Sequence, residues 1–240
     1  MLFEGALVAV ATVAGGVASI TGFGIGSLVT PFLSLALDTK LAVAVVSVPH
    51  LIATGIRFWM LRSHVDRRVL RGFGLMSAAG GLAGAILHAT IATPALTLVF
   101  GAILLFAGFM GVTGLSRRMR FPGIGAWIAG GISGGLGGMV GNQGGIRSAA
   151  LLGFDLPKEA FVATATAIGL IVDAARMPIY FWSEGEGILA SGKWVALSVL
   201  GVVVGTLIGA KFLRRLPEPT FRRVVSGFIL LLGVFMISRA

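Results

Sequence analysis

The sequence contains no cysteine, and only 12% of its 240 residues are charged. The missing thiols exclude disulfides, thiolate metal sites and cysteine-based catalysis. The scarcity of charge excludes a soluble fold, because a soluble domain carries about 25% charged residues. The only histidines, His50, His64 and His88, are scattered along the chain, so no zinc-type cluster is predicted. We therefore expect neither a metal nor another cofactor.

Apolar residues make up 56% of the chain and glycines number 37, which is typical of a membrane protein. The formal net charge is +10. In a soluble protein this excess would indicate a nucleic-acid partner. In a membrane protein it is explained first by cations gathered on the cytoplasmic side, so no nucleic-acid partner is expected.

Six segments are apolar and long enough to cross a bilayer core, which takes about 20 helical residues. They are residues 41–61, 72–91, 94–115, 160–182, 194–213 and 221–238. The polar loops between them are short. The sequence thus predicts one all-α integral membrane domain whose surroundings are the lipid bilayer.

Two further apolar stretches, residues 3–37 and 123–154, are interrupted by clustered glycines. We call residues 21–27 the first elbow and residues 134–145 the second elbow. Clustered glycines favour helix breaks, and non-helical backbone at membrane depth is tolerated only where protein buries it or where it lines a cavity. Each stretch is therefore predicted to be two helical arms joined at an elbow.

The chain divides into two related halves, residues 1–115 and 123–240, joined by a basic linker at 116–122. After each elbow comes a short polar joint, at residues 38–40 and 155–158, and then a span with an arginine near its far end. These arginines are Arg57 and Arg176. Weak internal symmetry of this kind is typical of secondary transporters.

Three loops are rich in arginine and lysine, residues 62–71, 116–122 and 211–223, and the positive-inside rule assigns all three to the cytoplasm. A simple eight-span topology places two of them on opposite faces. The conflict disappears if each broken stretch enters and leaves on one face as a hairpin. Each half is then a hairpin plus three transmembrane helices, and the halves form an inverted-topology repeat. The acidic segment 183–193 is predicted as an outside linker.

Residues 22–33 resemble the first-half motif of the TauE/SafE family of sulfite exporters and related anion permeases. Residues 37–42 resemble the polar joint of that family, and residues 134–145 and 156–160 repeat the pattern. The resemblance covers the whole chain, although the second half lacks a proline equivalent to Pro31 of the first-half motif. It implies a multi-pass protein of the bacterial inner membrane that moves a small anion such as sulfite or an organosulfonate such as sulfoacetate.

The elbows are the predicted anion site, because a broken helix offers free backbone N–H groups and the positive end of its dipole. In a fold with a pseudo-twofold axis, the two elbows are expected to meet near the membrane midplane. The elbow residues assigned to the anion are Gly24, Gly26, Ser27, Asn142, Gln143, Gly144 and Ser148.

Arg147 follows the second elbow, away from any loop. An arginine within a span costs about 2.5–3.5 kcal/mol on insertion scales, so it usually has a partner or a function. A guanidinium binds an oxoanion through two hydrogen bonds. Arg147 is therefore predicted to bind the substrate, and the alternative is an arginine that snorkels to the membrane surface.

Asp173 and Arg176 are three residues apart, so a helix places them on one face as a structural ion pair. The alternative makes Asp173 a proton-coupling carboxylate or Arg176 a second contact for the anion. His50, in the middle of a span, is either a packing group or a second proton carrier. Arg57 lies within about a turn of the cytoplasmic end and is predicted to snorkel.

The sequence has no GxxxxGK[ST] motif, so an ion, proton or substrate gradient must drive transport. The leading hypothesis is a secondary transporter that works by alternating access. The alternatives are a passive anion channel and an intramembrane phosphatase-type enzyme, which would need more buried acids than Asp173. The sequence does not predict which anion is moved, the direction of transport, the coupling ion or the oligomeric state.

Overall fold

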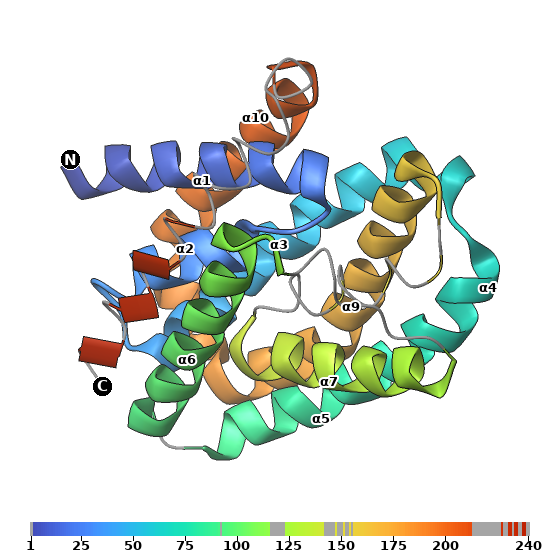
Figure 1. The fold of residues 1–240 in the computed structure, drawn as a ribbon. Coiled ribbons are helices and arrows are strands. Elements are labelled where there is room, and N and C mark those ends of the chain that lie inside the picture. Colours follow the sequence, from blue (N-terminus) through green and yellow to red (C-terminus); the bar gives the residue numbers. More distant parts are fainter. Residues whose placement is uncertain are drawn as a thin grey trace.

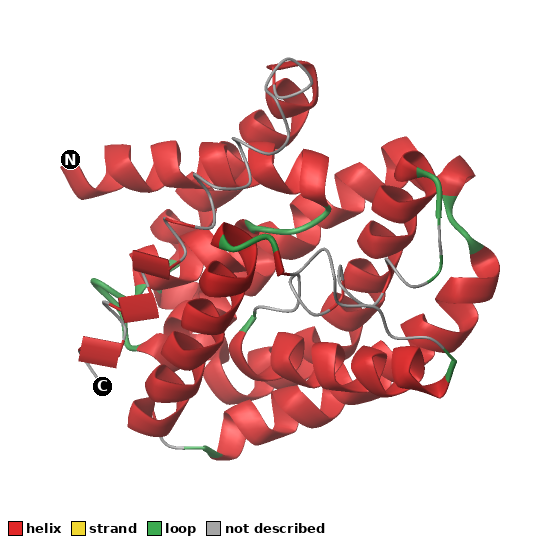
Figure 2. Ribbon diagram, in the orientation of Figure 1, coloured by secondary structure: helices red, strands yellow, loops and turns green. Residues whose placement is uncertain are grey.

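The computed structural model describes residues 2–91, 93–115, 123–141, 147, 151, 154, 156–212, 227, 230–231, 233–234 and 237–238. Within these residues every regular element is a helix (Figures 1 and 2). The elements are α1 (Leu2–Thr21), α2 (Ile25–Leu33), α3 (Thr39–Leu61), η1 (Arg62–His64), α4 (Arg67–Val69), η2 (Leu70–Gly74), α5 (Leu75–Thr90), α6 (Thr93–Val112), α7 (Ile124–Val140), α9 (Lys158–Ala190) and α10 (Gly192–Phe212).

In the part of the chain that is described, five helical segments are long and apolar enough to cross a membrane: Leu2–Ile20, Thr39–His64, Arg67–Thr90, Glu159–Ala190 and Gly192–Gly209. Four of them coincide with predicted spans, and the fifth is the first arm of the first broken stretch. A multi-pass membrane protein is thereby confirmed. The predicted span 94–115 corresponds to α6, and the predicted span 221–238 lies largely outside the described residues.

The helices are arranged around a central pair, α3 and α9. Helices α1 and α10 pack together on one side, and α5 and α7 pack together on the other (Figure 1). Helix α3 also contacts α10, and α9 contacts α5. The two central helices therefore lie between two flanking pairs.

The two central helices are antiparallel. Lys40 near the start of α3 forms an ion pair with Glu184 in the last turns of α9, with Nζ and Oε1 3.6 Å apart. Farther along, His50 of α3 contacts Asp173 of α9. The residue number of the contact increases along α3 as it decreases along α9, so the two helices run in opposite directions.

Each flanking pair is parallel. Lys193 and Glu4, near the starts of α10 and α1, form an ion pair, and the Ser19 hydroxyl near the end of α1 donates to the Thr206 carbonyl at 3.0 Å. On the other side, the Ser77 hydroxyl donates to Gly130 O at 3.0 Å, and His88 near the end of α5 contacts Met139 O near the end of α7.

Glycines bring the backbones of α5 and α7 into contact. A Cβ built on Gly134 would lie 2.0 Å from Ser77 O, and one on Gly138 would lie 1.9 Å from Gly81 O. These glycines are four residues apart on α7, so they share a face of a continuous helix. The prediction that the second elbow begins at Gly134 is therefore wrong: the helix extends to Val140, and these glycines serve packing.

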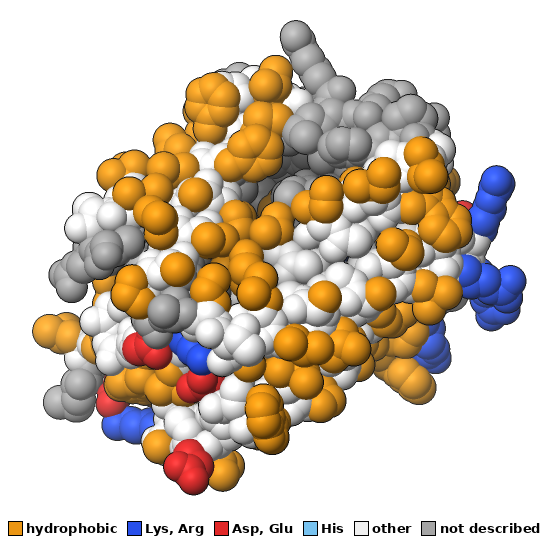
Figure 3. Space-filling model, turned by 90° about the horizontal axis from the view of Figure 1, so that it is seen from below, with side chains coloured by type: hydrophobic (Ala, Val, Ile, Leu, Met, Phe, Trp, Pro, Cys, Tyr) orange, Lys and Arg blue, Asp and Glu red, His pale blue; other side chains and the backbone are white. Residues whose placement is uncertain are grey.

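Charged side chains gather at two ends of the molecule, with apolar side chains between them on the face shown in Figure 3. One end, which we call the basic end, has the exposed residues Arg62, Arg67, Arg68 and Arg71. The other, which we call the mixed-charge end, has Glu4, Asp38, Lys40, Glu184, Glu186 and Lys193.

Each broken stretch starts and finishes at one end of the molecule. The first starts near Glu4 and finishes at Asp38, whose carboxylate accepts from Lys40 N at 3.1 Å and caps α3; both residues are at the mixed-charge end. The second stretch starts with α7, and near the start of this helix Trp127 lies against Gly72. It finishes near α9, where the Thr164 hydroxyl accepts from Asp66 N at 2.9 Å, at the basic end.

The predicted outside linker 183–193 is mostly helical, which corrects the sequence prediction. Helix α9 continues to Ala190, 33 residues in all. Contacts with the start of α3 hold this extension: a Cβ built on Gly187 would lie 2.6 Å from Leu41 Cδ1, and Glu184 pairs with Lys40. Its acidic side chains lie at the mixed-charge end of the molecule, which is the outside in the predicted topology.

Candidate anion site

The first elbow is a break between α1 and α2, as predicted. Helix α1 ends at Thr21 and α2 begins at Ile25. Between them, Gly22 and Gly24 have φ angles of 78° and 133°, which residues other than glycine rarely adopt. Gly26 and Ser27 lie in the buried first turn of α2. Amide groups at a helix start have no carbonyl acceptor within the helix, so this turn is suited to an anion.

The second elbow is shorter than predicted where it is described. Helix α7 ends at Val140, and the following residue, Gly141, has a left-handed φ of 73°. Asn142, Gln143, Gly144 and Ser148 lie outside the described residues, so their assignment to the anion stays a prediction.

The described part of the second elbow ends at Gly141, so the prediction that the two elbows meet stays a prediction. A Cβ on Gly22 would lie 3.3 Å from Ala165 Cβ, whereas one on Gly141 would lie 3.7 Å from Arg176 Nη1. The described parts of the two elbows therefore contact different residues of α9. The first arms, α1 and α7, are 20 and 17 residues long, and they run in opposite directions because α1 starts at the mixed-charge end and α7 starts at the basic end.

The described part of each elbow is contacted by a residue that follows the other elbow. Arg147 Nη2 donates a hydrogen bond to Gly22 O at 2.9 Å. Conversely, Thr30 Oγ1 of α2 lies 3.9 Å from the position of a Cβ on Gly141. The two broken stretches therefore contact each other at these two places.

Asp173 and Arg176 form the predicted ion pair, with Oδ1 and Nη2 2.7 Å apart and both side chains buried. Arg176 Nη1 also donates to Gly137 O at 2.5 Å. The guanidinium lies 5.5 Å from the centre of the Tyr180 ring, and the Tyr180 hydroxyl donates to Gly138 O. Arg176 is thus held by several groups of α7 and α9.

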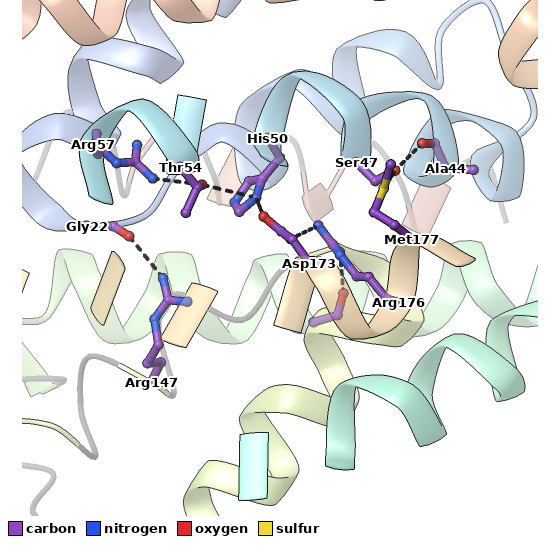
Figure 4. Close-up of polar contacts among 11 residues, drawn as sticks. Gly22, Ala44, Ser47, His50, Thr54, Arg57, Arg147, Asp173, Arg176 and Met177 are labelled. Carbon is purple, nitrogen blue, oxygen red and sulfur yellow. Dashed lines mark hydrogen bonds and ion pairs between the residues drawn. The ribbon is translucent and has the colours of Figure 1, made fainter. Parts of the chain in front are cut away.

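His50 connects this pair to α3. Its Nδ1 lies 2.6 Å from Asp173 Oδ2 and 3.4 Å from Thr54 Oγ1. The same hydroxyl accepts from Arg57 Nη2 at 3.1 Å. Figure 4 shows the resulting line of polar contacts from Arg57 to Arg176, and shows Arg147 with Gly22 beside it.

Arg57 does not snorkel, which corrects the sequence prediction. Its side chain is 3% exposed, because it lies on the face of α3 that turns toward α9 and is tied there by Thr54. Within the described part of the chain, its Nε and Nη1 atoms have no hydrogen-bond partner. The only sequence feature that could have indicated the burial of Arg57 was its position 119 residues before Arg176.

Arg147 is buried in the same way, with 2% exposure. Its Nη2 is used by Gly22 O, while Nε and Nη1 lack a partner among the residues described. A Cβ on Gly169 of α9 would lie 3.0 Å from Arg147 Nη1 and 3.6 Å from Thr54 Cγ2. Arg147 therefore lies beside the residue that holds Arg57.

Among the residues that the structure describes, the buried charges do not balance. The described residues include three buried arginines, Arg57, Arg147 and Arg176, and one buried carboxylate, Asp173. Asp173 is taken by Arg176 and His50. Burying a cation without a partner costs several kcal/mol, and Arg57 and Arg147 together form a buried region of positive charge. We call these two residues the open arginine pair.

Comparisons with known proteins agree with this chemistry. The family model described as "Sulfite exporter TauE/SafE" matches residues 7–236, nearly the whole chain. Searches of curated proteins and of solved structures found no match.

Proposed function

Because the chain belongs to the TauE/SafE sulfite exporter family, a family of transporters and not of enzymes, we propose that it is a secondary transporter of a sulfur oxoanion or organosulfonate, such as sulfite or sulfoacetate. The anion binds at the first elbow and the open arginine pair. The membrane is the bacterial inner membrane. The halves 1–115 and 123–240 move against each other to give alternating access.

The observation that carries the proposal is the buried guanidinium of Arg147, whose Nε and Nη1 have no hydrogen-bond partner among the described residues. It is bound to Gly22 O beside the N-terminus of α2, where Gly24, Gly26 and Ser27 lie. Arginine N–H groups and the start of a helix both favour an oxoanion. Asn142, Gln143, Gly144 and Ser148 are proposed to complete the site from the second elbow.

The helix directions support an inverted repeat. A twofold axis in the membrane plane that exchanges α3 and α9 makes them antiparallel, as they are. The same axis exchanges the parallel pair α1 and α10 with the parallel pair α7 and α5. Repeats of this kind allow one bundle to move against the other around a site between them.

His50 and Asp173 are proposed to couple transport to protons. The 2.6 Å contact between Nδ1 and Oδ2 gives a proton a short path between the imidazole and the carboxylate. The contact also crosses from α3 to α9, that is, from one half to the other. Protonation of His50 would therefore change a contact between the parts that must move.

The proposal is tested by reconstitution of the purified protein in liposomes. We expect uptake of ³⁵S-sulfite that saturates, that is inhibited by sulfoacetate, and that increases with an imposed pH gradient. A His50→Gln variant should keep sulfite exchange at equal pH and lose the effect of the gradient. Transport of no small anion would contradict the proposed function, and currents far above the rates of alternating access would instead indicate a channel.

A further inference from the structure

We propose that Arg57 is a second anion-binding residue and that, together with Arg147, it makes the protein selective for dianions over monoanions of the same size. The inference rests on the proposed function and adds the charge of the substrate to it. The observations that carry it are the burial, the anchoring and the unpartnered donors of Arg57.

Arg57 and Arg147 are presented in the same manner. Each guanidinium is fixed through Nη2, to Thr54 Oγ1 at 3.1 Å and to Gly22 O at 2.9 Å respectively. Each has Nε and Nη1 without a hydrogen-bond partner in the described chain. Both acceptors are neutral, so each arginine is positioned but keeps its full charge.

The two arginines belong to one region. A Cβ built on Gly169 would lie within 3.6 Å of both Arg147 Nη1 and the Thr54 methyl. The Thr54 hydroxyl in turn accepts a hydrogen bond from Arg57. Two like charges at short range in a poorly polarisable interior repel strongly. A ligand that carries two negative charges removes this repulsion, and a ligand with one removes only part of it.

The one buried carboxylate among the described residues is not paired with Arg57. Asp173 of α9 is bound to Arg176 and to His50, so its charge is already shared with cations. Arg176 adds a positive charge to the same line of contacts (Figure 4). With His50 neutral, the four charged residues of the cluster, Arg57, Arg147, Arg176 and Asp173, sum to two positive charges, which a dianion neutralises.

The test compares two anions of similar shape, the dianion sulfoacetate and the monoanion 2-hydroxyethanesulfonate, at pH 8. Affinities are measured by isothermal calorimetry on the full-length protein in detergent. The wild type should bind sulfoacetate about tenfold more tightly or better. Arg57→Gln should lower the affinity for sulfoacetate by about tenfold and change that for the monoanion by less than about threefold. Arg57→Lys, which keeps the charge, should retain most of the preference.

Arg62→Gln is the matched control, because Arg62 is exposed and lies over the Trp59 ring, 3.8 Å from its centroid. This variant should leave both affinities unchanged. Equal affinity of the wild type for the two anions overturns the inference, whatever the variants do, and so does an equal loss for both anions in Arg57→Gln. Binding of neither anion, together with absent transport, contradicts the proposed function itself.

Discussion

Arg57 and Arg176 stand 119 residues apart, each 18 residues after the first residue of its central helix, yet their surroundings differ. Arg176 is surrounded by Asp173, Gly137 O and the Tyr180 ring. Arg57 has the single acceptor Thr54 and two unpartnered nitrogens within the described chain. The predicted repeat accounts for an arginine at both places. The contrast teaches that Arg176 is part of the scaffold, and under the proposed function Arg57 keeps its charge for a ligand.

The sharpest test of this contrast makes the same substitution at both places. Arg176→Gln leaves the buried Asp173 carboxylate without its arginine, and breaking a buried pair costs about 3–5 kcal/mol. Arg57→Gln removes an unpaired buried charge and should leave the stability unchanged or higher. Thermal unfolding in detergent, without added anion, measures both. Equal losses of stability in the two variants would contradict the distinction.

The second prediction concerns the α7 carbonyls that hold the paired arginine. A Cβ on Gly138 would lie 1.9 Å from Gly81 O, so Gly138→Ala must push α7 away from α5 and displace the acceptor of Tyr180. Overpacking of this kind costs about 1–3 kcal/mol. The matched control on the same helix is Gly131→Ala, whose Cβ would make an ordinary contact of 3.7 Å with Met76.

Gly138→Ala and Gly131→Ala are compared by the midpoint of thermal unfolding. We expect a lower unfolding midpoint for Gly138→Ala than for the wild type, and no such decrease for Gly131→Ala. If the two variants unfolded at the same temperature, the α5–α7 contact would not support the Arg176 end of the molecule.

The smallest effect is expected beside the open arginine pair. Gly169→Ala places a Cβ 3.0 Å from Arg147 Nη1, the far end of a flexible side chain, so the guanidinium moves and the fold does not. We expect a loss of sulfite affinity of about two- to fivefold, or less than 1 kcal/mol, with unchanged thermal stability. Gly55→Ala in α3, where a Cβ would meet nothing within 4 Å, is the control. An unchanged affinity in Gly169→Ala would place the anion away from Arg147.

Much of the fold could be predicted from the sequence, because hydropathy and helix length decide which segments cross a membrane. The first elbow was also predictable, since Gly22 and Gly24 occupy φ angles that favour glycine. The second elbow was overextended because glycine serves two purposes: a break, as at Gly141, and close packing, as at Gly134 and Gly138. Composition alone does not separate these uses.

Within the candidate site, the pairing of Asp173 with Arg176 followed from their spacing of three residues on one helix. The burial of Arg57 did not follow, because it depends on the packing of α3 against α9, which is more than 100 residues away in the chain. The contact of Arg147 with Gly22 O is equally remote in sequence. Local patterns predict local pairs, whereas these contacts arise from the tertiary fold.

The central claim is that the buried guanidinium of Arg147 binds the anion. It is tested most directly by equilibrium binding of ³⁵S-sulfite to the purified wild type, to Arg147→Gln and to the exposed-site control Arg62→Gln. Loss of a charge-assisted hydrogen bond should weaken binding by about 10- to 100-fold in Arg147→Gln, with Arg62→Gln equal to the wild type. Equal affinity of all three proteins would contradict the account.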